Sequence, residues 1–153
     1  LNQISLDTER VTDKTLAALR EINLLHAFDG ATDADRRRPS KAEDIATLSL
    51  AGTSVTDAGL KDLKGLTNLT TLGLARTKVT DAGLKDLAPL ANLATLNLRE
   101  TKVTGAGLKD LKGLTRLTTL GLDDGVVTDT VLATLGEIGL LHALEAAESG
   151  NAG

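Results

Sequence analysis

The chain has 153 residues, 41% of them hydrophobic and 25% charged, with a net charge of −4, which is enough for one domain with a buried core. It contains no cysteine and one aromatic residue, Phe28, so disulfides, thiolate chemistry and cysteine-bound metals are excluded and the core must be aliphatic. The acidic balance gives no reason to expect a nucleic-acid or membrane-surface partner. No apolar run approaches the roughly 18 residues of a membrane span.

The first residues, LNQISLDTER, lack the basic and apolar regions of a signal peptide, and the chain does not begin with methionine. We therefore interpret the chain as a processed or trimmed piece of a longer protein. Because the sequence carries neither a targeting signal nor a cysteine, it leaves the localisation open.

A repeat of 24 residues runs through the single predicted domain, residues 1–153. The copies 48–71 and 72–95 match at 17 of 24 positions, which chance does not produce. In chain order, the predicted units are copy 4–27, a degenerate coil with a surface loop at 28–47, copies 48–71, 72–95, 96–119 and 120–143, and a C-terminal cap or truncated unit at 144–153.

Each copy combines two hydrophobic periods. Leu72 and Leu74 flank one small residue, as in a half-buried strand. Leu84 and Leu87 then begin a series with a leucine at every third position, as on one face of a helix. Between the two segments stands Thr80-Asp81-Ala82-Gly83, where Thr80 or Asp81 can cap the helix by accepting from free backbone N–H groups. A single copy leaves an apolar edge uncovered, whereas stacked copies bury it, so the pattern predicts a solenoid.

The pattern Leu69-x-x-Leu72-x-Leu74-x-x-Thr77-x-Val79 resembles the leucine-rich-repeat signature, and the segment VTDAGLKDL resembles repeats of large bacterial proteins of that family. The resemblance implies an α/β right-handed solenoid, with parallel strands on its concave face and short helices on its convex face. The family usually has asparagine at the positions of Thr53, Thr77 and Thr101. A threonine hydroxyl can also bond the turn backbone, so these three residues are expected to form a structural ladder facing backbone amides.

Motifs for chemistry are nearly absent, and we predict no enzyme activity, no cofactor and no metal site. His26 and His142 lie 116 residues apart at equivalent positions of two copies, which favours one structural position repeated by duplication over a joint metal or catalytic site. The adjacent Asp123 and Asp124 favour a solvated turn over a Ca²⁺ site. The basic run 36–38 is flanked by acidic residues and lacks aromatic neighbours, which favours a solvated loop over a phosphate contact.

The charged residues of the helical segments are expected on the outer side of each helix, away from the leucines. They include Asp62, Lys64, Lys85 and Asp86. In that position they would form a solubilising convex face.

The open face of the strands is small, flat and polar. Interface anchors are usually Trp, Tyr or Arg, and of these the face offers only Arg76 and Arg99. We predict a non-catalytic protein-interaction module with a partner-binding surface at Arg76, Asn97, Arg99 and Glu100. The alternative is a structural spacer segment of a longer repeat array, with no ligand of its own. The expected partner is a protein of unknown identity, with neither nucleic acid nor membrane expected.

The ends of the predicted solenoid pose a separate problem, since a stack exposes its core wherever it stops. Residues 141–147 are expected to fold over the final coil, with Glu145 and Glu148 outward. Copies 4–27 and 120–143 match at 14 of 24 positions, which indicates a longer unit of 116 residues and a chain taken from a longer array. We expect mostly a monomer, with weak end-to-end self-association.

Overall fold

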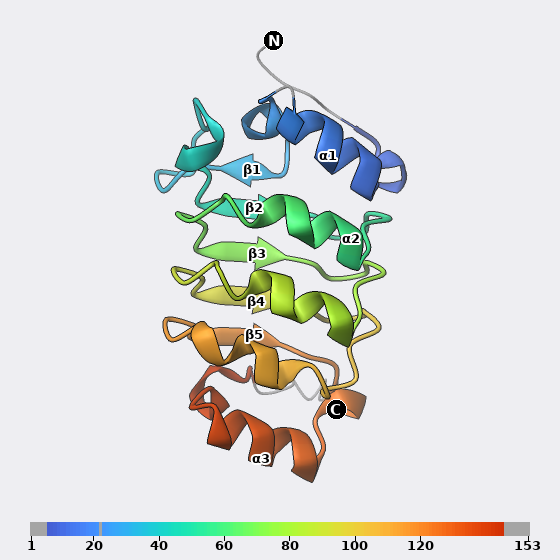
Figure 1. Cartoon of the computed structure of the whole chain (residues 1–153), viewed down its shortest axis with the longest axis vertical. Helices are drawn as coiled ribbons and strands as arrows, with labels where there is room; N and C mark the ends of the chain where they lie inside the picture. The colour runs from blue at the N-terminus through green and yellow to red at the C-terminus, as the bar shows by residue number, and fades with distance from the viewer. Residues whose placement is uncertain (1–5, 22, 146–153) are drawn as a thin grey trace, which may run out of the picture.

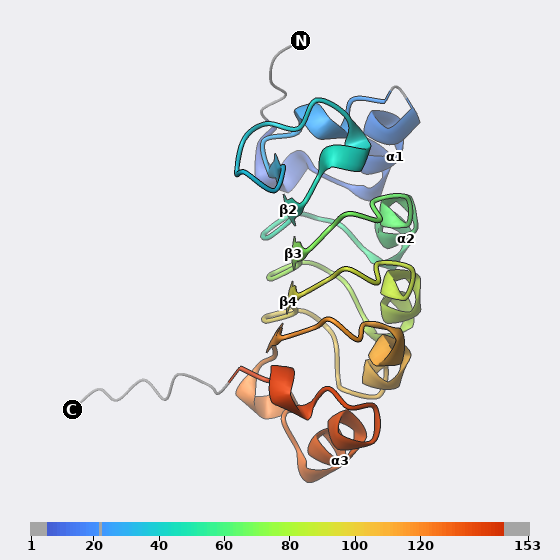
Figure 2. The same ribbon diagram turned by 90° about the vertical axis from the view of Figure 1, so that its left-hand side faces the viewer.

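The computed structural model describes residues 6–21 and 23–145 and shows a stack of coils, with strands along one side and helices along the other (Figures 1 and 2). Strands are labelled β, α-helices α and 3-10 helices η. In chain order the elements are η1 (Thr8–Arg10), α1 (Asp13–Glu21), η2 (Leu25–Ala27), β1 (Ala31–Thr32), η3 (Ala42–Asp44), β2 (Thr47–Ser49), α2 (Asp57–Leu60), η4 (Lys61–Leu63), β3 (Thr71–Gly73), η5 (Asp81–Leu87), β4 (Thr95–Asn97), η6 (Leu108–Gly113), β5 (Thr119–Gly121), η7 (Asp124–Val126), α3 (Asp129–Glu137) and η8 (Leu141–Ala143).

The sheet follows the repeat. Its five strands lie in the order β1-β2-β3-β4-β5, and β2 to β5 are parallel. Thr47, Thr71, Thr95 and Thr119 stand side by side in successive strands, so the register advances by one copy at each step. Parallel strands on the concave face and short helices on the convex face confirm the predicted α/β solenoid (Figure 2).

Strand β1 departs from the predicted parallel arrangement, because it pairs with β2 antiparallel, with Ala31 opposite Leu48. The cause is a tight turn directly after β1. The Oδ1 atom of Asp33 accepts hydrogen bonds from the amides of Asp35 (2.9 Å) and Arg37 (2.8 Å), and Arg36 adopts a left-handed φ of 61°. The turn reverses the chain, and the three arginines at 36–38 are exposed on it.

The core is a column of aliphatic side chains between sheet and helices. Leu72, Leu74, Leu84, Leu87 and Leu90 are all fully buried in one coil. The helical part of that coil is the 3-10 helix η5. A 3-10 helix has three residues per turn, so a leucine at every third position faces the core from one side.

The prediction that the charged helical residues all face solvent is wrong for two aspartates. Asp86 is only 5% exposed, and its Oδ1 atom lies 2.8 Å from Lys64 Nζ of the preceding coil. Asp62 accepts from Arg20 Nε at 3.0 Å. Both carboxylates therefore join neighbouring coils, because the helices stack closely enough for side chains on their flanks to meet.

Of the cap predicted at 141–147, the structure describes residues 141–145. Leu141 is 48% exposed and Ala143 is buried, Glu145 lies outward, and Leu144 forms a parallel bridge with Leu120. The predicted first strand near residues 4–6 and the predicted outward Glu148 fall wholly or mostly outside the described residues. Among the helices that the structure describes, none is both long and apolar enough to cross a membrane.

Candidate functional site

The middle of the concave face is kept flat by small side chains. Ser49, Gly73, Asn97 and Gly121 stand in one row across β2 to β5. A Cβ atom at Gly121 would lie 2.9 Å from Oδ1 of Asn97, so glycine makes room for the asparagine. The same Oδ1 atom accepts a hydrogen bond from the Arg99 amide at 3.0 Å, which holds Asn97 against the turn that follows β4.

The turns after the strands carry unusual backbone. Gly52, Arg76 and Glu100 occupy equivalent places after β2, β3 and β4, with left-handed φ values of 73°, 58° and 54°. Glycine adopts this conformation freely, whereas a side chain there meets the backbone. Both Arg76 and Glu100 are exposed, so neither burial nor core packing accounts for a side chain at these two positions.

Two ion pairs run along this edge of the concave face. The Nε atom of Arg76 lies 3.0 Å from each carboxylate oxygen of Glu100, and their side chains are 70% and 58% exposed. Arg99 NH2 lies 3.2 Å from Oε2 of Glu145. The structure thus pairs Arg76 with Glu100 and Asn97 with Arg99, which are the four residues singled out from the sequence.

Two acidic members of this network, Asp123 and Glu145, were not predicted from the sequence. In the earlier turns the amides of Gly52 and Arg76 donate to the carbonyls of Ala75 and Arg99. At the next turn the Glu100 amide donates instead to the Asp123 carboxylate, at 2.9 and 3.0 Å. Asp123 and Asp124 do lie at an exposed or half-exposed turn, and the Asp123 side chain also continues the row of bonds between turns.

The three threonines expected as a structural ladder close their own turns. The hydroxyls of Thr53, Thr77 and Thr101 each donate to the carbonyl three residues earlier, at 2.7 Å in every case. Thr53 and Thr77 are buried at 4% and 5% exposure. The expectation that the hydroxyls face backbone amides holds for Thr101, whose Oγ1 atom also accepts from the Val103 amide at 3.4 Å. At Thr53 and Thr77 the hydroxyl meets a carbonyl and acts as a donor.

A second row of polar contacts joins coils on the helical side. Asp13 accepts from the amide and hydroxyl of Thr56, at 2.8 and 2.5 Å, and Asp57 accepts from the same groups of Thr80, at 2.7 and 2.6 Å. Asp81 bonds Thr104 in the same way. Thr56 and Thr80 also cap their own helices, as predicted, but the aspartate contacts were not foreseen from the sequence.

The environment of Asp81 shifts its acidity. Partial burial raises the pKa of this carboxyl, but hydrogen bonds from Thr104 and from the amides of Gly107 and Gly105 more than compensate. The pKa of Asp81 therefore lies below its ordinary value of 3.8.

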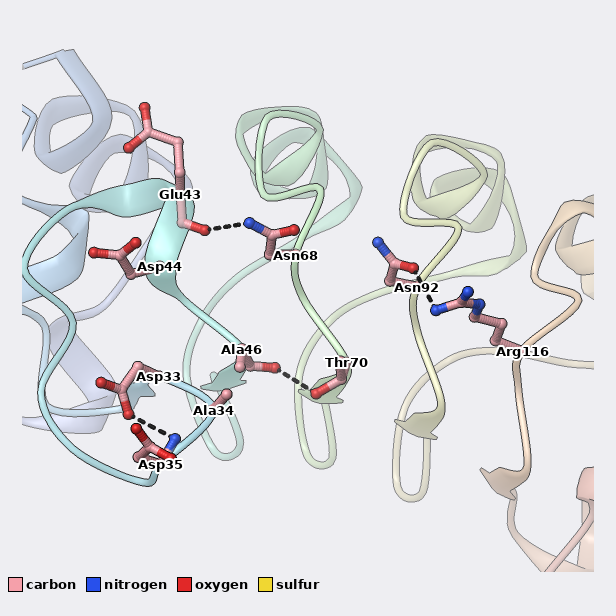
Figure 3. Close-up of a pocket in the computed structure, with 10 residues that line it drawn as sticks. All are labelled: Asp33, Ala34, Asp35, Glu43, Asp44, Ala46, Asn68, Thr70, Asn92 and Arg116. Atoms are coloured by element: carbon pink, nitrogen blue, oxygen red, sulfur yellow. Dashed lines mark hydrogen bonds between the residues drawn. The ribbon is translucent and has the colours of Figure 1, made fainter.

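An open groove of about 630 Å³ lies beside the β1 turn, where the return segments of successive coils meet (Figure 3). Asp33, Asp35, Glu43 and Asp44 line one end, and Arg116 lies at the other. Its amide side chains form hydrogen bonds between successive coils. Asn68 Nδ2 donates to the Glu43 carbonyl and Asn92 Nδ2 to the Thr67 carbonyl, both at 2.8 Å. Arg116 in turn donates to Asn92 Oδ1 at 3.0 Å. We therefore interpret the groove as the line along which successive coils join, and not as a ligand site.

The structure gives the two histidines separate surroundings. Nε2 of His142 lies 3.0 Å from the Leu117 carbonyl, while Nδ1 of His26 is buried without a hydrogen-bond partner. Within residues 6–21 and 23–145, no group of three or more His, Cys, Asp or Glu side chains is placed to hold a metal ion.

Residues 65–88 match the family model described as Leucine Rich repeat. Internalin C2 of Listeria monocytogenes is 20% identical over 94% of this chain and 73% of that chain, with a TM-score of 0.48. A second Listeria monocytogenes internalin is 22% identical over 62% of this chain and 33% of that chain, with a TM-score of 0.36. The search of curated protein sequences gives no match.

The matched segment has the length of one repeat, and the coil that contains it recurs along the stack. The strands on both sides of it pair in the same register, Thr47 with Thr71 and Thr71 with Thr95. The leucines that define the matched segment are buried in the shared core. One coil of the stack, residues 65–88, therefore matches the leucine-rich-repeat family model, and coils of the same register lie on both sides of it.

Proposed function

We propose that this chain is a non-catalytic protein-interaction module that binds a partner protein on its concave face, through Arg76, Asn97, Arg99 and Glu100. One observation carries the proposal. Arg76 and Glu100 are exposed and hold left-handed backbone at positions where the preceding coil has Gly52. A side chain in this conformation costs on the order of 1–2 kcal/mol, and strained residues of this kind cluster at functional sites.

The chemistry of the surface suits a partner that carries charge of both signs. Arg76 uses Nε for Glu100, which leaves its terminal guanidinium nitrogens without a hydrogen bond among the described residues. A carboxylate of a partner can take both of them. Arg99 stands one coil further along, with its side chain 37% exposed, and supplies a second cationic group beside the flat row formed by Asn97.

The alternative function is a structural spacer with no ligand of its own. In its favour, the two arginines already have acidic partners within the chain, Glu100 and Glu145, and the concave face contains no aromatic anchor. In that case both ion pairs only hold coils of the stack together, and the surface contributes nothing to recognition.

A binding experiment separates the two functions. Proteins captured by the immobilised chain are compared with those captured by a double variant, Arg76→Ala with Arg99→Ala. If these arginines are interface anchors, their loss weakens binding by about 2 kcal/mol or more, roughly 30-fold. The matched control is Lys61→Ala with Lys85→Ala, two exposed lysines of the helical side, which should retain every partner. Retention of every partner by the arginine variant would exclude the concave-face proposal.

A charge swap tests whether the ion pair has only a structural role. Arg76→Glu with Glu100→Arg restores the pair between coils but inverts the pattern that a partner meets. We expect unchanged stability and lost binding. Restored stability with full binding would show that the pair only joins coils.

A further inference from the structure

The first and last full coils have the same architecture. Each contains a 3-10 turn, a nine-residue α-helix and a second 3-10 turn, namely η1, α1 and η2 in one and η7, α3 and η8 in the other. Every element of the second coil lies 116 residues beyond its counterpart. After each helix a left-handed residue occurs at the same place, Asn23 and Gly139. The duplication seen in the sequence is thus also a duplication of structure.

The two coils differ in what covers them. Leu16 and Leu25 of the first coil are 0% and 1% exposed. Their counterparts in the last coil, Leu132 and Leu141, are 37% and 48% exposed, and they are the large apolar side chains that the structure leaves exposed within the described residues. The same apolar face is therefore closed at one place in the chain and open at the other.

The coil that closes the first face is visible in the structure. Helix α1 packs against α2 and η4, and η2 packs against η3. Asp13 at the start of α1 accepts two hydrogen bonds from Thr56, and Gly59 leaves the space that the Asp13 carboxylate occupies. These contacts belong to residues 42–63, the end of the degenerate coil and the start of the next copy.

The open face offers the same contacts. Asp129, the counterpart of Asp13, begins α3 and is exposed, with no hydrogen bond to its carboxylate among the described residues. Residues 146–153 read AAESGNAG, and they include no apolar side chain larger than alanine. The N-terminal coil shows no exposed large apolar side chain in its described part, so a second copy stacked head to tail has little there to bury.

We propose that the face formed by Asp129, Leu132 and Leu141 is a docking surface for a further coil of the type formed by residues 42–63, continued in the same polypeptide. Its Thr-Asp-Ala-Gly segment binds Asp129 as Thr56 binds Asp13. This surface is separate from the concave face, and the proposal does not depend on the proposed function.

The test extends the chain. Residues 1–143 are continued by a second copy of residues 28–71, and amide hydrogen exchange is measured over residues 129–143. In the extended protein we expect exchange there at least about tenfold slower than in the original chain. Two variants locate the effect. Leu132→Asp should abolish the slowing in the extended protein yet leave the original chain folded and unchanged, and Gly59→Val in the appended copy alone should abolish it by filling the space for Asp129.

Three results would overturn the proposal. In the first, exchange over 129–143 is the same with and without the extension. In the second, exchange in the original chain slows as its concentration rises, which makes a second copy the occupant. In the third, deletion of residues 146–153 accelerates exchange over 129–143, which makes the chain's own tail the cover.

Discussion

The carboxylate of Asp57 accepts hydrogen bonds from both the amide and the hydroxyl of Thr80, at 2.7 and 2.6 Å. The two residues belong to adjacent coils, and the same arrangement joins Asp13 to Thr56 and Asp81 to Thr104. The row ends where Gly105 replaces the aspartate, and a Cβ atom there would collide with Val131. The helical side of the stack is therefore held by repeated charge-assisted bonds as well as by leucine packing.

Loss of one such contact should be measurable. Asp57→Ala removes two hydrogen bonds to a charged acceptor and leaves the Thr80 amide without its partner, so we expect a loss of about 2 kcal/mol in the free energy of unfolding by urea. Asp129→Ala is the matched control, because Asp129 also begins a helix but bonds no residue of the next coil in the described chain. It should cost no more than about 1 kcal/mol, the contribution of a carboxylate at a helix start. Equal losses would mean that the helix start, and not Thr80, accounts for the effect.

Gly83 should be intolerant of any side chain. A Cβ atom there would stand closer than 3.0 Å to the Asp57 carboxylate, which Thr80 holds in place. Gly83→Ala should therefore destabilise the chain by about 1–3 kcal/mol, even though alanine favours helices. Gly65→Ala serves as the comparison, since a Cβ atom at that position meets nothing within 4 Å and should not lower the melting temperature. A tolerated alanine at Gly83 would contradict the close approach of the two coils.

Thr77 should be structural. Its buried hydroxyl donates to the Leu74 carbonyl at 2.7 Å, and that carbonyl also accepts the Thr77 amide at 3.3 Å. Thr77→Val keeps the shape and removes one of the two bonds, so we expect a cost of about 1 kcal/mol in urea unfolding. Thr115→Val, at an exposed position, should be neutral. An unchanged stability for Thr77→Val would show that the hydroxyl contributes nothing to the turn.

Acid should weaken the contact between Asp81 and Thr104. The folded-state pKa of Asp81 lies below 3.8, so the folded state binds the proton less readily than the unfolded chain does. Its contribution to stability is complete above the ordinary pKa and is lost as the pH falls through the folded-state value. The unfolding free energy should decline below about pH 4, and the decline should be shallower in Asp81→Asn. Urea titrations of the original chain and of Asp81→Asn from pH 7 to 2 check this. Parallel curves for the two proteins would contradict the prediction.

The sequence by itself determined the solenoid. Leu72 and Leu74 recur in every central copy at the same spacing, and a stack places equal positions of successive copies against one another. The period alone therefore predicts which residues meet, as the pairing of Thr71 with Thr95 shows. Asn97 was found on the concave face by the same reasoning, since strand alternation indicates which side chains leave the core, and Arg76, Arg99 and Glu100 follow from their equivalent positions just after the strands.

Only the tertiary structure decided the partners of the polar side chains. From its sequence context, the aspartate at the start of each helix can either cap its own helix or bond a residue of the next coil. Asp57 bonds Thr80 of the next coil, because Gly83 leaves room for its carboxylate. Asp86 also pairs with Lys64, and Glu145 pairs with Arg99, across coils of the stack. A leucine needs only an apolar neighbour, which the repeat guarantees, whereas a hydrogen bond needs atoms placed within a few tenths of an ångström. That placement depends on how closely neighbouring coils stack, which the repeat period alone does not specify.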